Sequence, residues 1–149
     1  ARGLRVAMQS AQADLHLENI LRTVLGWKLI DFEGDNHIPL GQRVALDSPL
    51  RDVASMLRSF DYVAQHLLIA DHPRDAQIAY RAVEWSERNA EAFCAGYAAA
   101  SGAGYPDEPA LLRAYLLDKA VQEALHEARL RPHWLPIPLS AVQRLLAAA

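Results

Sequence analysis

Most of the chain, from Ser48 onward, carries apolar residues at helical spacing, and this pattern constrains the possible folds more than any other feature. Ser48 is a suitable N-cap and Pro49 suits the first helical position, so a helix is expected to begin there. Breakers then divide the remaining sequence into further helices. The predicted helices run from Ser48 to Asp71-His72-Pro73, from about Asp75 to Ala100, and from about Asp107 to Arg131.

The C-terminal segment is rich in proline. Pro132 is expected to stop the third helix. Residues 134–138 are predicted to form a rigid extended connector, because proline fixes its own backbone and disfavours helix in the residue before it. A short last helix is then expected to carry Leu139, Val142, Leu145 and Leu146.

The segment before Ser48 has a different pattern. Residues 20–23 and 27–30 are short runs of apolar or β-branched residues separated by Val24-Leu25-Gly26, which predicts a β-hairpin with glycine in the turn. Residues 34–47 show no periodicity and are predicted to form a loop beside the metal site described below. The expected fold is one domain over residues 1–149, mainly α-helical with a small β-hairpin.

The composition excludes several classes of function. A chain of 149 residues with 52% hydrophobic residues can bury a sizeable core. Its net charge of -3 argues against binding nucleic acid through phosphate contacts. The single cysteine, Cys94, permits no internal disulfide, and the sequence contains no apolar run long enough to span a membrane. We therefore expect a cytoplasmic protein without nucleic-acid or membrane partners.

Asp14 and Asn19, followed by an apolar strand that ends in Asp31, form the motif with the most chemical content. Phosphoryl transfer from ATP needs a carboxylate that orients the acceptor hydroxyl and takes its proton. It also needs an amide oxygen and a second carboxylate that hold the Mg²⁺ bridging the phosphates. The spacing Asp-x4-Asn, then Asp-Phe after a strand, supplies these groups in order. Asp and Asn at this spacing also cap turns, but the whole pattern predicts a kinase catalytic segment.

The nucleotide-gripping elements of such a kinase are not found in this sequence. Only thirteen residues precede Asp14, and the chain contains no Gly-x-Gly-x-x-Gly or Gly-x4-Gly-Lys-Ser/Thr motif. In kinases a glycine-rich loop and an upstream lysine hold the phosphates. We therefore expect that this chain lacks the N-terminal lobe of such a kinase. The missing N-terminal lobe would then be a required partner, and the isolated chain would be inactive.

The motif segments Asp14–Asn19 and Ile30–Gly34 resemble the aminoglycoside-phosphotransferase-like kinases. The segments Gly26–Gly34, Ser48–Tyr62 and Arg131–Pro138 look like bacterial maltokinases, and nearly as much like the related actinobacterial glucosamine kinases. The resemblance implies the C-terminal lobe of a bilobal protein-kinase-like fold. Its catalytic loop and metal site would lie in residues 12–35, and its acceptor-binding helices in residues 48–149. One departure is Gln12-Ala13, where the family has His-Gly.

The resemblance also implies roles for individual residues. Asp14 matches the catalytic base, and Asn19 and Asp31 match the positions of magnesium ligands. Glu33 belongs to the Asp-Phe-Glu variant of the metal motif, and it lies either near the metal or in solvent. Asp52 matches an aspartate that holds the backbone of the catalytic loop in kinases.

Acceptor-binding residues are predicted on the third helix. A polar stripe at i, i+3, i+4, i+7 spacing is usually a solvated face, but the resembling family binds its sugar on this helix. The candidates are Lys119, Gln122 and His126. Trp134 is either an aromatic wall for the sugar or an anchor for the connector, and His16 either contacts the substrate or packs behind the loop. Arg51 and Arg58 fit surface charges.

The leading interpretation is the C-terminal lobe of an ATP-dependent, maltokinase-like sugar kinase that makes maltose 1-phosphate. The alternatives are a glucosamine kinase and a truncated, non-catalytic lobe. Lys119 and a neutral His126 suit an uncharged sugar, whereas the ammonium of glucosamine needs a carboxylate. Glu123 and Glu127 on the same helix would reverse the preference for maltose if either turned toward the sugar.

Overall fold

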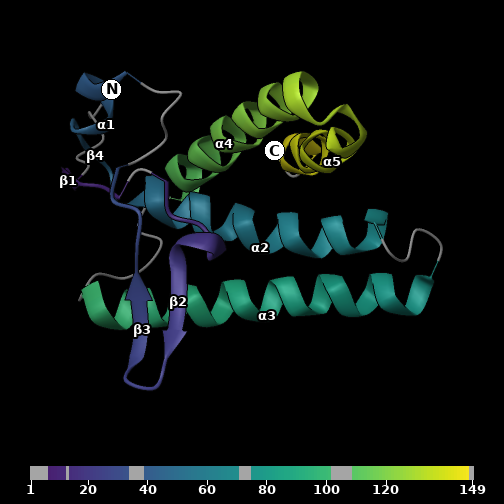
Figure 1. The fold of residues 1–149 in the computed structure, drawn as a ribbon, viewed down its shortest axis with the longest axis horizontal. Helices are drawn as coiled ribbons and strands as arrows, with labels where there is room; N and C mark the ends of the chain where they lie inside the picture. The colour runs from purple at the N-terminus through teal and green to yellow at the C-terminus, as the bar shows by residue number, and fades with distance from the viewer. Residues whose placement is uncertain (1–6, 13, 34–38, 71–74, 102–108, 148–149) are drawn as a thin grey trace.

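The computed structural model describes residues 7–12, 14–33, 39–70, 75–101 and 109–147. Three long helices dominate it, α2 (Leu50–Ala70), α3 (Ala76–Ser101) and α4 (Pro109–Leu130), followed by α5 (Pro136–Ala147). α2 is the central helix: it packs against α3 on one side and α4 on the other, and α5 packs on α4 (Figure 1). The prediction of a mainly helical fold with a small hairpin is confirmed.

The core lies along α2. Val53, Ala54, Phe60 and Ala64 are buried on this helix. The ring of Phe60 meets Trp85 and Phe93 of α3 edge-on, with centroids 6.0 and 6.3 Å apart, an arrangement that suits the charge distribution of aromatic rings. The apolar spacing predicted that Phe60, Trp85 and Phe93 lie in the core, and the structure shows that they meet between α2 and α3.

Polar side chains fix where the helices begin. The hydroxyl of Ser48 accepts a hydrogen bond from the N–H of Leu50 at 3.2 Å, as an N-cap does. Asp75 accepts from the N–H groups of Gln77 and Ile78 at the start of α3. Both predicted helix starts agree with these contacts. Of the breakers predicted at residues 71–73 and 101–106, residues 71–73 and 102–106 lie outside the described residues, whereas Ser101 is the last residue of α3.

The predicted hairpin is formed by β2 (Ile20–Thr23) and β3 (Gly26–Leu29), an antiparallel pair in which Ile20 lies opposite Leu29. Gly26 has a φ of +123°, a conformation that residues with a Cβ rarely adopt. A short 3₁₀ helix, η1 (Leu17–Asn19), leads into β2. The hairpin lies at the end of the helical layer where α2 begins (Figure 1).

Two expectations were wrong. The segment predicted as a loop contains the short helix α1 (Leu40–Arg43) and the strand β4 (Leu46–Asp47), which pairs with β1 (Gln9–Ser10). A two-residue strand is too short to show alternation, so only its distant partner reveals it. Residues 34–38 of that segment lie outside the described residues.

The proline-rich segment is helical rather than extended. The 3₁₀ helix η2 (Pro132–Trp134) is followed directly by α5, which begins at Pro136. Proline is tolerated in the first turn of a helix because the N–H groups there have no partner within the helix. Within the described residues, none of the helices combines the length and apolar character that crossing a bilayer requires.

Candidate active site

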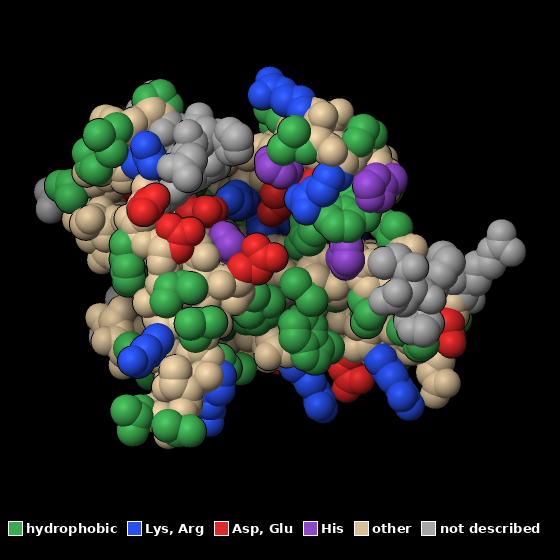
Figure 2. All heavy atoms as spheres, in the orientation of Figure 1, with side chains coloured by type: hydrophobic (Ala, Val, Ile, Leu, Met, Phe, Trp, Pro, Cys, Tyr) green, Lys and Arg blue, Asp and Glu red, His purple; other side chains and the backbone are tan. Residues whose placement is uncertain are grey.

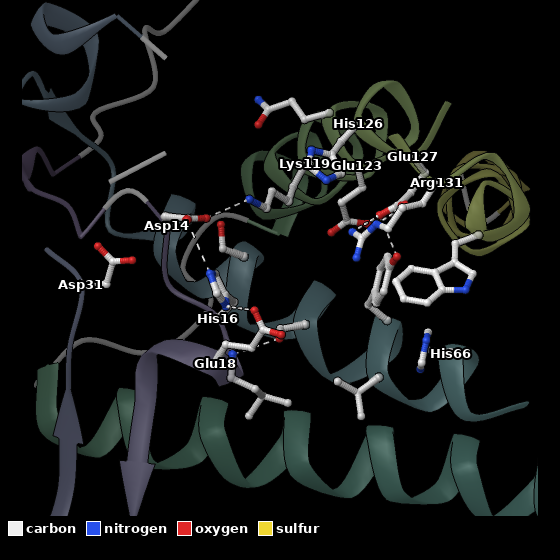
Figure 3. A pocket seen from close by; sticks show the side chains of 17 residues that line it. Asp14, His16, Glu18, Asp31, His66, Lys119, Glu123, His126, Glu127 and Arg131 are labelled. Atoms are coloured by element: carbon white, nitrogen blue, oxygen red, sulfur yellow. Dashed lines mark hydrogen bonds and ion pairs between the residues drawn. The ribbon is translucent and has the colours of Figure 1, made fainter. Parts of the chain in front are cut away.

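A pocket of about 600 Å³ lies between α2, α4 and the segment that carries Asp14. Figure 2 shows acidic, basic and histidine side chains gathered in this hollow below α4. Seven of the residues predicted from the sequence line it, as Figure 3 illustrates: Asp14, His16, Asp31, Lys119, Gln122, His126 and Trp134. The other three predicted residues, Asn19, Glu33 and Asp52, are not among the described residues that line it.

The hairpin register brings the two halves of the predicted catalytic motif together. Ile20 pairs with Leu29, and the N–H of Ile30 donates to the carbonyl of Asn19 at 3.0 Å. Asn19 therefore lies across from the residue that precedes Asp31. Asp14 and Asn19 precede the first strand of the hairpin and Asp31 follows the second. Antiparallel pairing places the start of one strand beside the end of the other, so these residues lie on the same end of the hairpin.

Asp14 lies among positively charged or chargeable groups. His16 Nε2 is 3.4 Å from one carboxylate oxygen and Lys119 Nζ is 3.4 Å from the other. The hydrogen bond from His16, aided by the charge of Lys119, lowers the pKa of Asp14 despite partial burial. The same bond raises the pKa of His16 above its usual 6.5. Asp14 is therefore an ionised, partly enclosed carboxylate, which is the state a general base requires.

Asn19 supports the loop from behind. Asn19 is only 5% exposed, and its side-chain Nδ2 donates a hydrogen bond to the carbonyl oxygen of Asp14 at 3.1 Å. The same nitrogen is 3.2 Å from His16 Nε2, which can accept it only when that ring atom carries no proton. Asn19 thus holds the backbone of Asp14 through its amide nitrogen, independently of any metal-binding role of its amide oxygen.

The predicted magnesium ligands differ in their positions. Asp31 is exposed and faces the pocket, whereas Glu33 is exposed outside it and its carbonyl accepts from Arg43. No group of three or more His, Cys, Asp or Glu side chains in the described part of the chain is arranged to hold a metal. Mg²⁺ bound with a nucleotide needs only one or two protein oxygens, because phosphates and water supply the rest. Asp31 and the amide oxygen of Asn19 are hard oxygen donors of the type it prefers.

Gln12, which no sequence argument singled out as a site residue, joins three segments of the site. Its Oε1 accepts from the N–H of Asp14 at 2.9 Å, and its Nε2 donates to the carbonyl of Asp31 at 2.6 Å. Its own N–H donates to Asp52 Oδ2 at 2.7 Å. The last contact is the one that the predicted role of Asp52 requires. Ala13 lies outside the described residues.

The bond from Gln12 falls on a strained residue. Asp31 has a φ of 57°, the left-handed region that few residues other than glycine adopt. Such conformations persist where the surroundings hold them, and they concentrate at functional sites. An amide side chain suits this place because it carries both a donor and an acceptor. A glutamine two residues before the predicted base, able to donate and accept at once, is the feature of the sequence by which Gln12 could have been identified.

The helix α4 contributes the opposite wall. Gln122 donates to Asp118 at 2.7 Å. Glu123 and Glu127, one helical turn apart, also line the pocket, so both turn inward. Figure 3 shows them on the same side of α4 as Lys119 and Arg131. The sequence favoured maltose unless Glu123 or Glu127 turned toward the sugar site. Both carboxylates do turn into the pocket.

Each inward carboxylate is held by an arginine. Arg58 of α2 donates Nε and Nη2 to Glu123 Oε2, at 3.1 and 2.5 Å. Arg131 donates to both oxygens of Glu127, and the hydroxyl of Tyr62 adds a bond of 2.7 Å. Arg58 is only 3% exposed, so the reading of it as a surface charge was wrong. Burial raises the pKa of Glu123, and Arg58 opposes this shift.

Trp134 closes the end of the pocket that is distant from Asp14. The guanidinium of Arg131 lies 4.4 Å from the centre of its ring, and His66 meets it edge-to-face at 4.3 Å. The side chain therefore lines the pocket and anchors the C-terminal segment at once, so the two readings of Trp134 are not exclusive. Both of its neighbours are chargeable, which leaves less of the ring for an apolar contact with a sugar.

Comparison with known proteins adds a relationship to this geometry. No protein-family model matches the sequence. The chain is 28% identical over 144 residues to a glucosamine kinase of Mycolicibacterium smegmatis (strain ATCC 700084 / mc(2)155), a match that covers 95% of this chain and 35% of the relative. It thus spans about a third of that protein's length.

Solved structures agree on the fold. A glucosamine kinase in complex with glucosamine, ADP and inorganic phosphate matches with a TM-score of 0.78 and 24% identity, over 95% of this chain and 36% of the other. Two further crystal forms of a glucosamine kinase match with the same TM-score, over 34% and 35% of their chains. A match to about a third of a kinase chain fits a C-terminal lobe. The chain is related in sequence to a sugar kinase and shares the fold of part of one.

Proposed function

We propose that this chain is the catalytic and acceptor-binding lobe of an ATP-dependent sugar kinase whose acceptor is the amino sugar glucosamine. Residues 12–35 would supply the catalytic loop and the metal site, and residues 48–149 the acceptor-binding helices, within one domain. The observation that carries the acceptor assignment is the inward position of Glu123 and Glu127 in the pocket that also contains Asp14. Because this chain spans about a third of the related kinase, we propose the activity only for this lobe together with a part that binds the nucleotide phosphates.

The roles follow from the geometry. Asp14 would orient the acceptor hydroxyl and take its proton, since it is ionised and reaches the pocket. Lys119, 3.4 Å from that carboxylate, would hold it in place and contact the acceptor. Asp31 and Asn19 would hold Mg²⁺, which neutralises charge on the transferring phosphoryl group when bound. Asp52 and Gln12 would keep the loop that carries Asp14 in register with Asp31.

The acceptor preference is where this proposal replaces the first interpretation. Maltose needs neutral hydrogen-bonding groups and an apolar wall, and the comparisons do not support a maltokinase. An ammonium group needs carboxylates in a partly desolvated site, where a charged hydrogen bond is strong. The relatives named above are glucosamine kinases, which favours the same acceptor.

The test is acceptor competition in the intact protein that contains this chain. We expect a higher kcat/KM for glucosamine than for glucose or maltose. Glu123→Gln removes one carboxylate charge and should raise the KM for glucosamine about 10- to 100-fold, the range for losing a hydrogen bond to a charged group. The KM for glucose should change little.

Glu84→Gln is the matched control, because Glu84 lies on α3 outside the pocket in an exposed pair with Arg88. This variant should behave like the wild type. A wild-type preference for maltose, or an equal loss for both monosaccharides in Glu123→Gln, would refute the acceptor assignment. Absence of any sugar-dependent turnover would instead favour a non-catalytic lobe.

A further inference from the structure

We infer that Arg58 is a positioning residue for acceptor selection: it holds one oxygen of Glu123 so that the other is presented to the amino group of the acceptor. The inference rests on the proposed function. It assigns a functional role to a residue on α2, the helix that forms much of the core and one side of the pocket. Arg58 itself is not among the residues that line the pocket.

The guanidinium of Arg58 is enclosed and has its donors directed at two acids. Its side chain is 4% exposed. Nε and Nη2 both reach Glu123 Oε2, while Nη1 donates to Asp61 Oδ2 at 2.5 Å. Contacts on two edges of a planar group fix its rotation, so the position of Glu123 Oε2 is fixed as well.

The distribution of bonds on Glu123 is asymmetric. Both bonds from Arg58 fall on Oε2, and among the described residues Oε1 accepts no hydrogen bond. Glu127 differs, because Arg131 and Tyr62 engage both of its oxygens. Of the two inward carboxylates, Glu123 is therefore the one with an oxygen available to a ligand. An ammonium group bound to that oxygen would extend the row of alternating charges formed by Asp61, Arg58 and Glu123.

The other end of this chain reaches α5. Asp61 Oδ2 also accepts from Arg144 Nη2 at 2.7 Å, so two arginines and two acids join α2, α4 and α5. Removing an arginine from a buried pair leaves an uncompensated charge, and this by itself would destabilise the protein. A stabilising role and a positioning role therefore make different predictions only for acceptor choice, which the experiment must measure.

The experiment compares glucosamine with glucose in the intact protein. Arg58→Lys keeps the charge but cannot reach two acids with a planar fork. We expect it to lower the ratio of kcat/KM for glucosamine over glucose about tenfold, through KM for glucosamine, with kcat and the KM for ATP within about twofold, since one charged hydrogen bond is loosened. Arg88→Lys is the matched control, because Arg88 is an exposed helical arginine paired with Glu84. It should leave the ratio unchanged.

The decisive step is a double-mutant cycle with Glu123→Gln. If Arg58 acts through Glu123, Arg58→Lys should have no further effect on the ratio once the carboxylate is gone. Thermal unfolding is measured in parallel, and a lower melting temperature without a change in the ratio would overturn the inference. So would an equal effect of Arg58→Lys in both backgrounds.

A second variant keeps the test open if Arg58→Lys does not fold. Asp61→Asn removes the charge that fixes the far edge of the guanidinium and should lower the ratio two- to threefold, as expected for a weakened rather than lost contact. An unchanged ratio in that variant would overturn the inference. The proposed function fails separately, if wild-type protein does not prefer glucosamine or if Glu123→Gln has no effect.

Discussion

Two walls of the pocket, which also borders α2, differ in construction. The loop wall consists of Asp14, His16, Glu18 and Asp31. The helix wall consists of residues of α4, chiefly Lys119, Glu123 and Glu127, together with Arg131 directly after the helix. The loop wall comes from a 3₁₀ turn and a hairpin. A few hydrogen bonds hold its backbone: Gln12 and Asn19 bond to the backbone of Asp31 and Asp14, and Asp52 accepts from the N–H of Gln12. The helix wall belongs to a three-helix layer whose charges are paired by arginines and a tyrosine.

Under the proposed function, this difference would separate the groups that react from the groups that recognise the acceptor. A general base and a metal ligand must be partly open to substrate and able to exchange protons, and the loop wall leaves Asp14 24% exposed at its side chain. Recognition of a charged acceptor benefits from groups fixed before the ligand arrives, which reduces the ordering that binding requires. The buried ion pairs of α4 provide that fixation.

The largest effect is expected in the loop wall. Asp14→Asn in the intact protein should lower kcat about 10²- to 10⁴-fold, because a positioned general base is lost, while nucleotide affinity stays nearly unchanged. Steady-state kinetics and nucleotide binding measure the two quantities. Glu91→Gln, exposed on α3, is the control. A rate near that of the wild type would remove Asp14 from the role of base.

The next prediction compares how much a substitution in the helical layer and one in the loop wall lower the free energy of unfolding. Phe60→Ala should lower the free energy of unfolding by about 3–5 kcal/mol, because the ring is 6% exposed between two aromatic side chains of α3. Gln12→Ala should cost only about 1 kcal/mol per lost hydrogen bond at a partly exposed site. Urea unfolding of the intact protein compares them. Similar losses for both variants would contradict the division between a rigid helical layer and a lightly held loop.

The smallest effect concerns pH. The raised pKa of His16 contributes stability that is fully present below pH 6.5 and disappears as the pH rises through the folded-state pKa. The lowered pKa of Asp14 contributes stability that is present above pH 3.8 and disappears as the pH falls through its folded-state pKa. Their contribution should therefore be largest between about pH 4 and 6.5, the range that these two shifts define.

His16→Asn tests this pH dependence. The variant should be less stable than the wild type between pH 4 and 6.5, and the two should converge at higher pH, as followed by melting temperature against pH. His133→Asn is the control for loss of a histidine ring: His133 is exposed on η2 outside the pocket, and its ring packs edge-to-face on Trp134 at 5.2 Å rather than beside a carboxylate. A constant difference at every pH would show that His16 acts through packing instead.

Local patterns were sufficient for much of this molecule. The long helices, the cap at Ser48, the helix start near Asp75 and the hairpin with Gly26 at its turn all depend on neighbours in sequence, and they were predicted. The motif of Asp14, Asn19 and Asp31 was predicted from its spacing, and the hairpin register places Asn19 across from the residue before Asp31. The proline-rich segment was misread because proline is compatible with both an extended chain and the first turn of a helix.

What the sequence determined by itself is therefore the helical layer and, in the loop wall, the candidates Asp14, His16 and Asp31, since periodicity, capping and a short motif act over a few residues; Glu18 was added by the structure. Only the tertiary structure decided which way the charges of α4 face. Glu123 and Glu127 could equally have been solvated, and Arg58 could have been a surface charge. They are enclosed because α2 and α4 pack together, and an ionised group can be enclosed there only when a partner compensates its charge, as Arg58 does for Glu123 and Arg131 for Glu127.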